Sequence, residues 1–336
     1  MKSEKRIAYW LFALAGYVML VVAIGGLTRL MDAGLSITEW LPITGIFPPL
    51  TENAWKEAFL QYQQIPEFQL INYTMSLAEF QHIYWWEWAH RMLARGAGLL
   101  FIFPFLWFWG RREIPKGCMK YLLLLFALGL SQGVLGWFMV KTGLSERVDV
   151  SPIFLMVHLL VALSIFSLSL WIGFSLIGGR ILLPVYQWNY SVWCAVIIVI
   201  LLFYQASLGA LLAGMDGGKI LTDWPFMDGK LIPNEMFVLI PFWQNIFFNP
   251  VLIQFSHRLI AYILIGIVIW QFYKWRVSSA KWLLYALLGQ SLLGIFTLYS
   301  SVALWLGSLH QIMAVIVFGF SLWHLWNLLH PKRMVL

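Results

Sequence analysis

Charged residues are scarce in this chain. Only 11% of its 336 residues are Asp, Glu, Lys or Arg, whereas about a quarter of a soluble domain is charged. Apolar runs of about 20 residues, the length of a membrane-spanning helix, recur along the sequence. Because helices satisfy their own backbone hydrogen bonds in lipid, the composition excludes an ordinary soluble enzyme. It predicts an all-α polytopic membrane protein.

Cysteine is also rare, and the two that occur are Cys118 and Cys194. The first falls in a predicted loop and the second inside a predicted span, so we expect no structural disulfide between them. Neither has the spacing of a zinc ligand. The net charge of +7 is explained by loops on one side of a membrane, and it does not indicate a nucleic-acid partner.

Eight apolar segments predict eight transmembrane helices, of which the first is a retained span because no small-residue cleavage site follows it. The expected spans are Ala8–Gly26, Trp85–Trp109, Tyr121–Val140, Pro152–Leu176, Val192–Ala213, Pro250–Phe272, Trp282–Leu298 and Ala303–Leu328.

The distribution of basic residues predicts the orientation. Basic residues gather before the first span and after each even-numbered span, at Lys2, Lys5, Arg6, Arg111, Arg112, Lys116, Lys120, Arg180, Lys274, Arg276, Lys281, Lys332 and Arg333. We therefore expect both termini on the cytoplasmic side of a bacterial membrane, or on the matrix side of the mitochondrial inner membrane.

An internal repeat predicts the architecture. The segment Met31–Trp40 recurs without a gap as Met215–Trp224, and Gln132–Gly136 resembles Gln290–Gly294. A duplicated unit of this size indicates two copies of one four-helix bundle, residues 1–180 and 181–336. Because each copy has an even number of spans, we expect parallel repeats related by an axis along the membrane normal.

Four of the seven histidines lie at the outer ends of even-numbered spans, two in each half: His90, His158, His257 and His310. One such histidine alone is explained equally well by an interhelical hydrogen bond. Four at equivalent positions favour two haems, each held by opposed imidazoles in a bundle. A transition-metal ion is the competing interpretation, but it would need three or four ligands converging on one point.

Glu87 breaks the symmetry of the repeat, because Gln254 stands at the equivalent position before His257. A carboxylate near one haem can stabilise positive charge or move a proton. The alternative is an ion pair with Arg91 that anchors the helix end. Arg91 and Arg258 are candidate contacts for haem propionates, with snorkelling to the interface as the alternative.

The motifs Gly25–Leu30, Gly34–Ser36 and Glu87–Arg91, together with the four histidines, resemble the haem A synthase family over nearly the whole chain. The resemblance implies oxidation of the C8 methyl of haem O to a formyl group through a hydroxymethyl intermediate. It implies a haem b cofactor on His257 and His310. It also implies substrate haem O on His90 and His158, with Glu87 as the catalytic acid.

The first outer loop, residues 27–84, contains no cysteine, whereas one bacterial branch of the family carries a cysteine pair there. The chain therefore resembles the branch found in proteobacteria and mitochondria. Implied partners are membrane lipid, a haem O synthase, assembly factors of terminal oxidases and a redox partner that the sequence does not identify. A homo-oligomer is a further expectation.

Two other functions remain open from the sequence. A bis-histidine di-haem electron-transfer cytochrome would fit the ligand pairs, but such carriers usually space their haems across the bilayer, and these histidines share one side. A haem transporter or chaperone would need a gated path and often an ATP-driven partner, and the chain has no nucleotide-binding motif.

Overall fold

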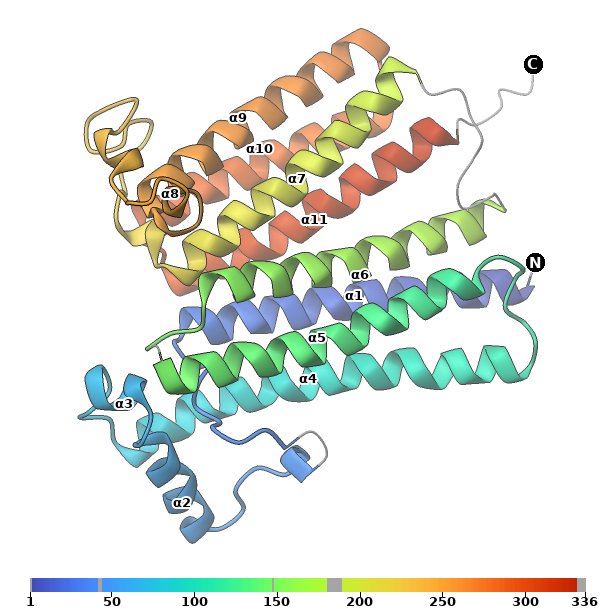
Figure 1. Ribbon diagram of the computed structural model, residues 1–336. Coiled ribbons are helices and arrows are strands. Elements are labelled where there is room, and N and C mark those ends of the chain that lie inside the picture. Colours follow the sequence, from blue (N-terminus) through green and yellow to red (C-terminus); the bar gives the residue numbers. More distant parts are fainter. Residues whose placement is uncertain (1, 42–43, 147, 180–188, 331–336) are drawn as a thin grey trace, which may run out of the picture.

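The computed structural model describes residues 2–41, 44–146, 148–179 and 189–330, and these residues are predominantly helical (Figure 1). Among these described residues, eight helices are long and apolar enough to cross a membrane. They are α1 (Lys2–Leu30), α4 (Leu77–Gly110), α5 (Met119–Glu146), α6 (Pro152–Gly178), α7 (Tyr190–Gly214), α9 (Pro250–Trp275), α10 (Ser278–Tyr299) and α11 (Leu304–Leu329). The predicted all-α fold with eight spans is confirmed.

The long helices form two four-helix bundles (Figure 1). In the first, α1 packs against α4 and α6, and α5 packs against α6; in the second, α7 packs against α9 and α11, and α10 packs against both of these. The bundles meet where α1 contacts α11, α6 contacts α7, and α6 contacts α11. If the two halves are interchanged, the α1–α11 contact becomes the α7–α6 contact and the α6–α11 contact is unchanged, as a two-fold repeat requires. The expected boundary between residues 180 and 181 lies outside the described residues, as do Arg180, Lys332 and Arg333.

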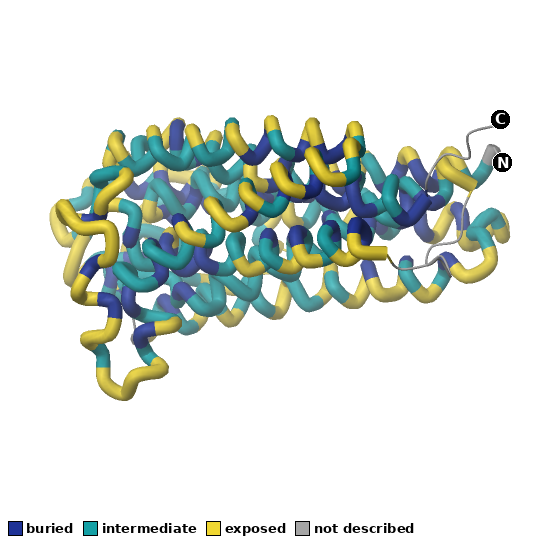
Figure 2. Tube along the Cα trace, turned by 90° about the horizontal axis from the view of Figure 1, so that it is seen from above, coloured by how far each residue is buried: buried dark blue, intermediate teal, exposed yellow. Residues whose placement is uncertain are grey.

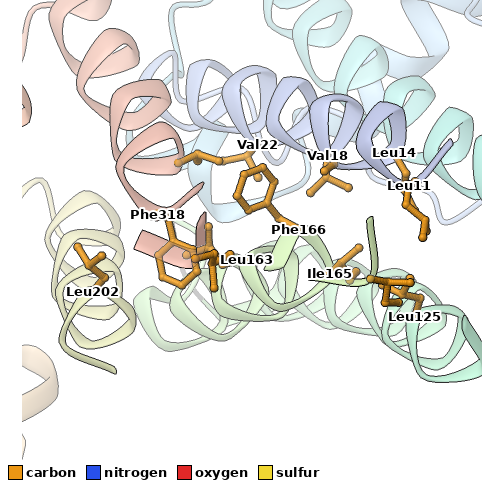
Figure 3. Close-up of a cluster of buried hydrophobic side chains, with 14 of the residues drawn as sticks. Leu11, Leu14, Val18, Val22, Leu125, Leu163, Ile165, Phe166, Leu202 and Phe318 are labelled. Carbon is orange, nitrogen blue, oxygen red and sulfur yellow. The ribbon is translucent and has the colours of Figure 1, made fainter. Parts of the chain in front are cut away.

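A buried apolar cluster joins the two bundles (Figure 3). Val22 of α1 and Phe166 of α6 come from the first bundle, and Leu202 of α7 and Phe318 of α11 come from the second. Large apolar residues such as Phe103 of α4 are exposed. Exposed positions recur along the outward faces of the long helices (Figure 2). This pattern suits a protein whose surroundings are lipid, because lipid imposes no cost on exposed apolar surface.

The two long loops, between α1 and α4 and between α7 and α9, are the long outer loops, and they lie at one end of the bundles, opposite the start of α1 (Figure 1). They contain short helices that the sequence does not predict: η1 (Thr44–Ile46), α2 (Glu52–Tyr62), α3 (Pro66–Leu70), η2 (Gly217–Lys219), η3 (Asn234–Phe237) and α8 (Gln244–Phe248). The repeat holds in the backbone, since Asp32 and Asp216 both adopt a left-handed conformation, with φ of 49° and 51°.

Helix α4 begins at Leu77 rather than at the expected Trp85. A capping box fixes this start: the Ser76 hydroxyl accepts a hydrogen bond from the Glu79 N–H, and the Glu79 carboxylate accepts one from the Ser76 N–H at 2.7 Å. Such a box satisfies backbone donors that the first turn leaves free. The polar turns of α4 therefore extend beyond the apolar run, and His90 lies deeper within its helix than hydropathy predicts.

Candidate functional site

The structure brings the four histidines together in two pairs. The His90 ring lies close enough to His158 for the two to interact electrostatically, and His257 lies similarly close to His310. Each pair comes from helices that flank a common neighbour, α4 and α6 beside α1, and α9 and α11 beside α7. Within the described part of the chain, no three His, Cys, Asp or Glu side chains gather at one point.

Each of the four imidazole rings lies against a glycine on a neighbouring helix. A Cβ added at these glycines would stand 2.7 Å (Gly25 to His90), 3.0 Å (Gly294 to His310), 3.3 Å (Gly209 to His257) and 3.8 Å (Gly136 to His158) from the ring carbon Cε1. Real Cβ atoms essentially never approach within 3.0 Å of such an atom. The glycines therefore allow each histidine-bearing helix to pack closely on its neighbour.

Glutamines hold the backbone of three of these histidines. The side-chain Nε2 of Gln132 donates to the His158 carbonyl at 2.9 Å, and Gln205 and Gln290 donate to the carbonyls of His257 and His310 at 3.0 Å. Sequence analysis singled out the segments of Gln132 and Gln290 but missed Gln205. The available signal was spacing, because each of these glutamines precedes its glycine by one helical turn.

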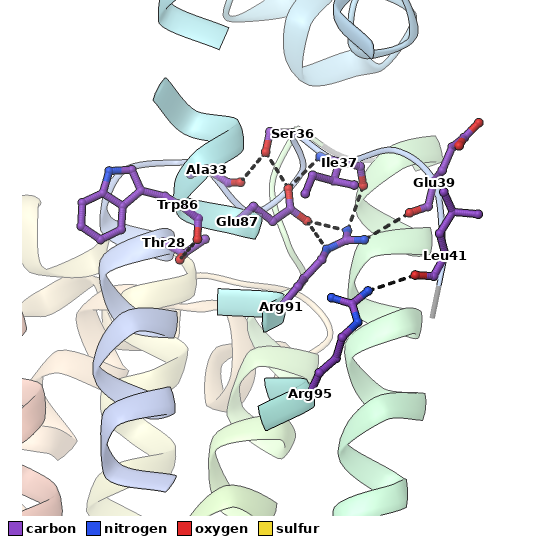
Figure 4. Close-up of polar contacts among 10 residues, drawn as sticks. All are labelled: Thr28, Ala33, Ser36, Ile37, Glu39, Leu41, Trp86, Glu87, Arg91 and Arg95. Atoms are coloured by element: carbon purple, nitrogen blue, oxygen red, sulfur yellow. Dashed lines mark hydrogen bonds and ion pairs between the residues drawn. The ribbon is translucent and has the colours of Figure 1, made fainter. Parts of the chain in front are cut away.

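Glu87 is buried, and its carboxylate is fully engaged (Figure 4). Its Oε2 accepts hydrogen bonds from the Ser36 hydroxyl at 2.7 Å and the Ile37 N–H at 2.8 Å. Its Oε1 forms an ion pair with Arg91 Nη2 at 2.6 Å. The anchoring role that the sequence left open is therefore present: Glu87 fastens the first outer loop to α4.

Gln254 makes the equivalent contacts to the loop of the second half. Its Nε2 donates to the carbonyls of Gly217 at 3.3 Å and Leu221 at 3.0 Å. Glu87 thus accepts from its loop, whereas Gln254 donates to its own. At this repeat position the first half therefore has a buried carboxylate, paired with Arg91, where the second half has a neutral amide.

Arg91 and Arg258 bind repeat-equivalent loop carbonyls. Arg91 donates to Ile37 and Glu39, and Arg258 donates to Leu221, Asp223 and Phe226. Both guanidinium groups therefore already hold the outer loops. Arg258 Nε is buried without a hydrogen-bond partner, so it retains a free donor.

A cavity of about 300 Å³ lies beside Arg91 within the first outer loop. Arg95 and two acidic residues, Glu39 and Glu57, also line it. Because Arg91 is also the ion-pair partner of Glu87, the cavity lies next to the Glu87–Arg91 pair.

A family model for cytochrome oxidase assembly proteins matches residues 8–322. The chain belongs to this family. Among its relatives is a protein named heme A synthase from Parvibaculum lavamentivorans, 43% identical over 97% of this chain and 95% of that protein. Proteins of the same name from Chelativorans sp. and Bradyrhizobium sp. are 41% and 40% identical, over 96% and 99% of this chain and 91% and 94% of their own lengths. The resemblance to the family is thus confirmed.

The residues at the two pairs fit haem. The Nδ1 atoms of all four histidines are buried without a hydrogen-bond partner, and neutral imidazole is a usual ligand of haem iron. The glycines and glutamines around them fix the backbone from which the rings project. A second buried carboxyl that sequence analysis missed, Glu67 of α3, lies outside the helices that carry these pairs.

Proposed function

We propose that this chain is a haem A synthase, an enzyme that oxidises haem O to haem A. The observation that carries the proposal is the match over nearly the full length to proteins named heme A synthase. The two buried histidine pairs support it, because a substrate haem and a cofactor haem need two separate sites.

The two halves divide the work. His90 and His158 hold the substrate, and His257 and His310 hold haem b. Support for this division comes from Glu87, since only the first pair has a buried carboxylate nearby, whereas the second has the neutral Gln254. Haem b, when bound, supplies a one-electron redox centre.

The reaction takes the C8 methyl of haem O through two successive two-electron oxidations, each consuming an external oxidant. The first gives a hydroxymethyl group and the second a gem-diol, which loses water to give the formyl group. Glu87 contributes a fixed negative charge, held in place by Ser36, Ile37 and Arg91. Such a preorganised charge stabilises a developing positive centre or orients an attacking water without reorganising during the reaction.

Propionate contacts are assigned first to Arg258, whose Nε is the free donor described above. Arg91 contacts a propionate by exchanging one of its loop carbonyls. A guanidinium group suits this role because its planar donors match a carboxylate.

The protein is an integral membrane protein, and we place it in the bacterial cytoplasmic membrane with both termini in the cytoplasm. The excess of basic residues at the ends of α4 and α9 supports this orientation. Its partners are a haem O synthase, assembly factors of terminal oxidases and a separate redox protein. The family's role in cytochrome oxidase assembly supports these partners.

The test is acid–acetone extraction and mass analysis of haems from protein produced with a haem O source. We expect haem b together with haem O, its hydroxylated product or haem A. Haem b alone, with no conversion during aerobic turnover, would instead support an electron-transfer cytochrome. Bound haem O that is never converted would support a haem transporter or chaperone.

A further inference from the structure

Three of the four histidine-bearing segments are clamped by a glutamine, and His90 is the exception. In the clamped cases a glutamine one turn before the glycine donates to the histidine carbonyl. On α1, the residue one turn before Gly25 is Val21. Its side chain has no hydrogen-bond donor.

Val21 occupies the position of the missing clamp. The backbone carbonyl of Val21 lies beside the His90 ring, as that of Gln205 lies beside the His257 ring. Gly25 and Gly209 touch the same two rings. Helix α1 therefore lies against α4 in the same relative position as α7 lies against α9. The two pairs differ in that α7 has a glutamine that bonds the histidine carbonyl, whereas α1 has Val21.

The packing of α4 shows a second, independent difference. Helix α4 approaches α5 closely at few positions, whereas its repeat equivalent α9 packs against α10 over much more of its length. Each helix has one most apolar stretch. The buried share of that stretch is 17% in α4 and 6% in α5, whereas it is 28% in α9 and 22% in α10. The helix that carries His90 is thus held less firmly by α5 than α9 is by α10. Helix α1 still bonds α4 at two other carbonyls, from Trp10 to Leu100 and from Thr28 to Trp86, so the difference on the α1 side is confined to the clamp at His90.

We propose that Val21, in place of a glutamine, makes His90 the releasable ligand. Haem then exchanges at the His90–His158 site and is retained at the His257–His310 site. This inference rests on the proposed function, in which the first site must release its product at every turnover and the second keeps its cofactor. A glutamine that holds the histidine backbone does not hinder a site that keeps its haem. At a site that must exchange its haem, the same hydrogen bond would slow haem release.

The experiment exchanges the clamp between the halves. Full-length protein carrying both haems is mixed with excess apomyoglobin in detergent, and haem transfer is followed by absorbance, with mass analysis of the haem that leaves. In the natural protein we expect haem O or haem A to leave first and haem b to remain. One hydrogen bond corresponds to about a threefold to tenfold change in rate.

Val21→Gln should slow the loss of the substrate haem by this factor and leave haem b unaffected. Gln205→Val should accelerate the loss of haem b by a similar factor. Val21→Leu is the size control: it brings no donor, so it should not slow exchange. A Gln132→Val variant should accelerate loss only at the first site.

Equal rates of loss for the two haems in the natural protein would overturn the inference. So would an unchanged rate in both Val21→Gln and Gln205→Val, or equal slowing by Val21→Leu and Val21→Gln. Purified protein that binds no haem at all would instead overturn the proposed function, so the two failures are distinguishable.

Discussion

At the scale of single residues, the distance between each glycine and its imidazole determines which substitutions the sites tolerate. A methyl group at Gly25 would stand 2.7 Å from His90, whereas one at Gly136 would make an ordinary contact of 3.8 Å with His158. We expect Gly25→Ala to lower substrate-haem occupancy severalfold, because the ring must move. Gly136→Ala should retain most of it. The ratio of haem O to haem b extracted per protein measures both, and equal losses would contradict the prediction.

Glu87 has two roles to separate, loop anchor and fixed charge. Glu87→Gln keeps the shape of the side chain but removes the charge, so we expect bound haem to be retained and haem A production to fall at least tenfold. Ser36→Ala is the matched control, because it removes one anchoring hydrogen bond and leaves the carboxylate. If both variants lose activity equally, anchoring explains Glu87. Normal haem A production by Glu87→Gln would end its assignment as the catalytic residue.

The sequence predicts the four histidines because the repeat and the start of each apolar run mark them independently. It does not predict which group clamps His257, since Gln205 lies in a span where a glutamine has many explanations. Glu67 was missed for a different reason. Its burial depends on how α2, α3 and the start of α4 pack around it, and no local pattern encodes that packing.

At the scale of elements, the first outer loop should respond to pH through Glu67. Burial, together with the charges of Asp149 and Glu87, raises the pKa of Glu67 to about 8, whereas an unfolded glutamate titrates near about 4.3. The folded loop therefore holds a proton that the unfolded loop releases. The stability of the loop is greatest below the unfolded pKa and is lost as the pH rises through about 8.

Hydrogen exchange of the segment 63–75, corrected for intrinsic rates, measures this effect. We expect protection in the natural protein to fall between pH 6 and pH 8.5, by at most about tenfold per pH unit. Glu67→Gln has no titrating group at this position and should show little change over the same range. Equal pH dependence in both proteins would show that another group controls the loop.

Hydropathy places the membrane-embedded parts of the elements well but not their ends. The apolar run of α4 starts at Trp85, yet the Ser76–Glu79 capping box sets its start at Leu77. The short helices α2 and α3 are too brief and too polar to stand out from a loop. They form because Tyr62 and Phe80 pack together in a small apolar cluster outside the bundles.

At the scale of the whole molecule, one polar contact between the bundles can be tested. Gln311 of α11 donates to the Val22 carbonyl of α1 at 2.9 Å, and its amide lies directly over Gly26. The repeat equivalent of Gln311 is Leu159, so the contact exists on one side only. Gln311→Ala should cost about 1 kcal/mol.

Gly26→Ala should displace the same amide, because the new methyl group would overlap it. Both single variants should therefore lower the thermal midpoint in detergent. The double variant should be no less stable than Gly26→Ala alone, since the clash and the lost hydrogen bond involve one side chain. Additive losses would show that the two changes act at separate places.

The repeat itself is visible in the sequence, because Met31–Trp40 and Met215–Trp224 align without a gap. The looser packing of α4 on α5 is not visible, since their apolar faces read like those of α9 and α10. The difference is seen only in the assembled structure, because lipid-facing and buried positions of a membrane helix are both occupied by apolar residues such as leucine.

The contacts between the two bundles are reciprocal. When α1 meets α11, its counterpart α7 meets α6, which is the interface of a two-fold homodimer. Two copies of one half would pair in the same way and would carry two identical sites. In a single chain, unlike in such a homodimer, a substitution falls on one site alone. The first half can therefore carry Glu87 and Val21 where the second carries Gln254 and Gln205.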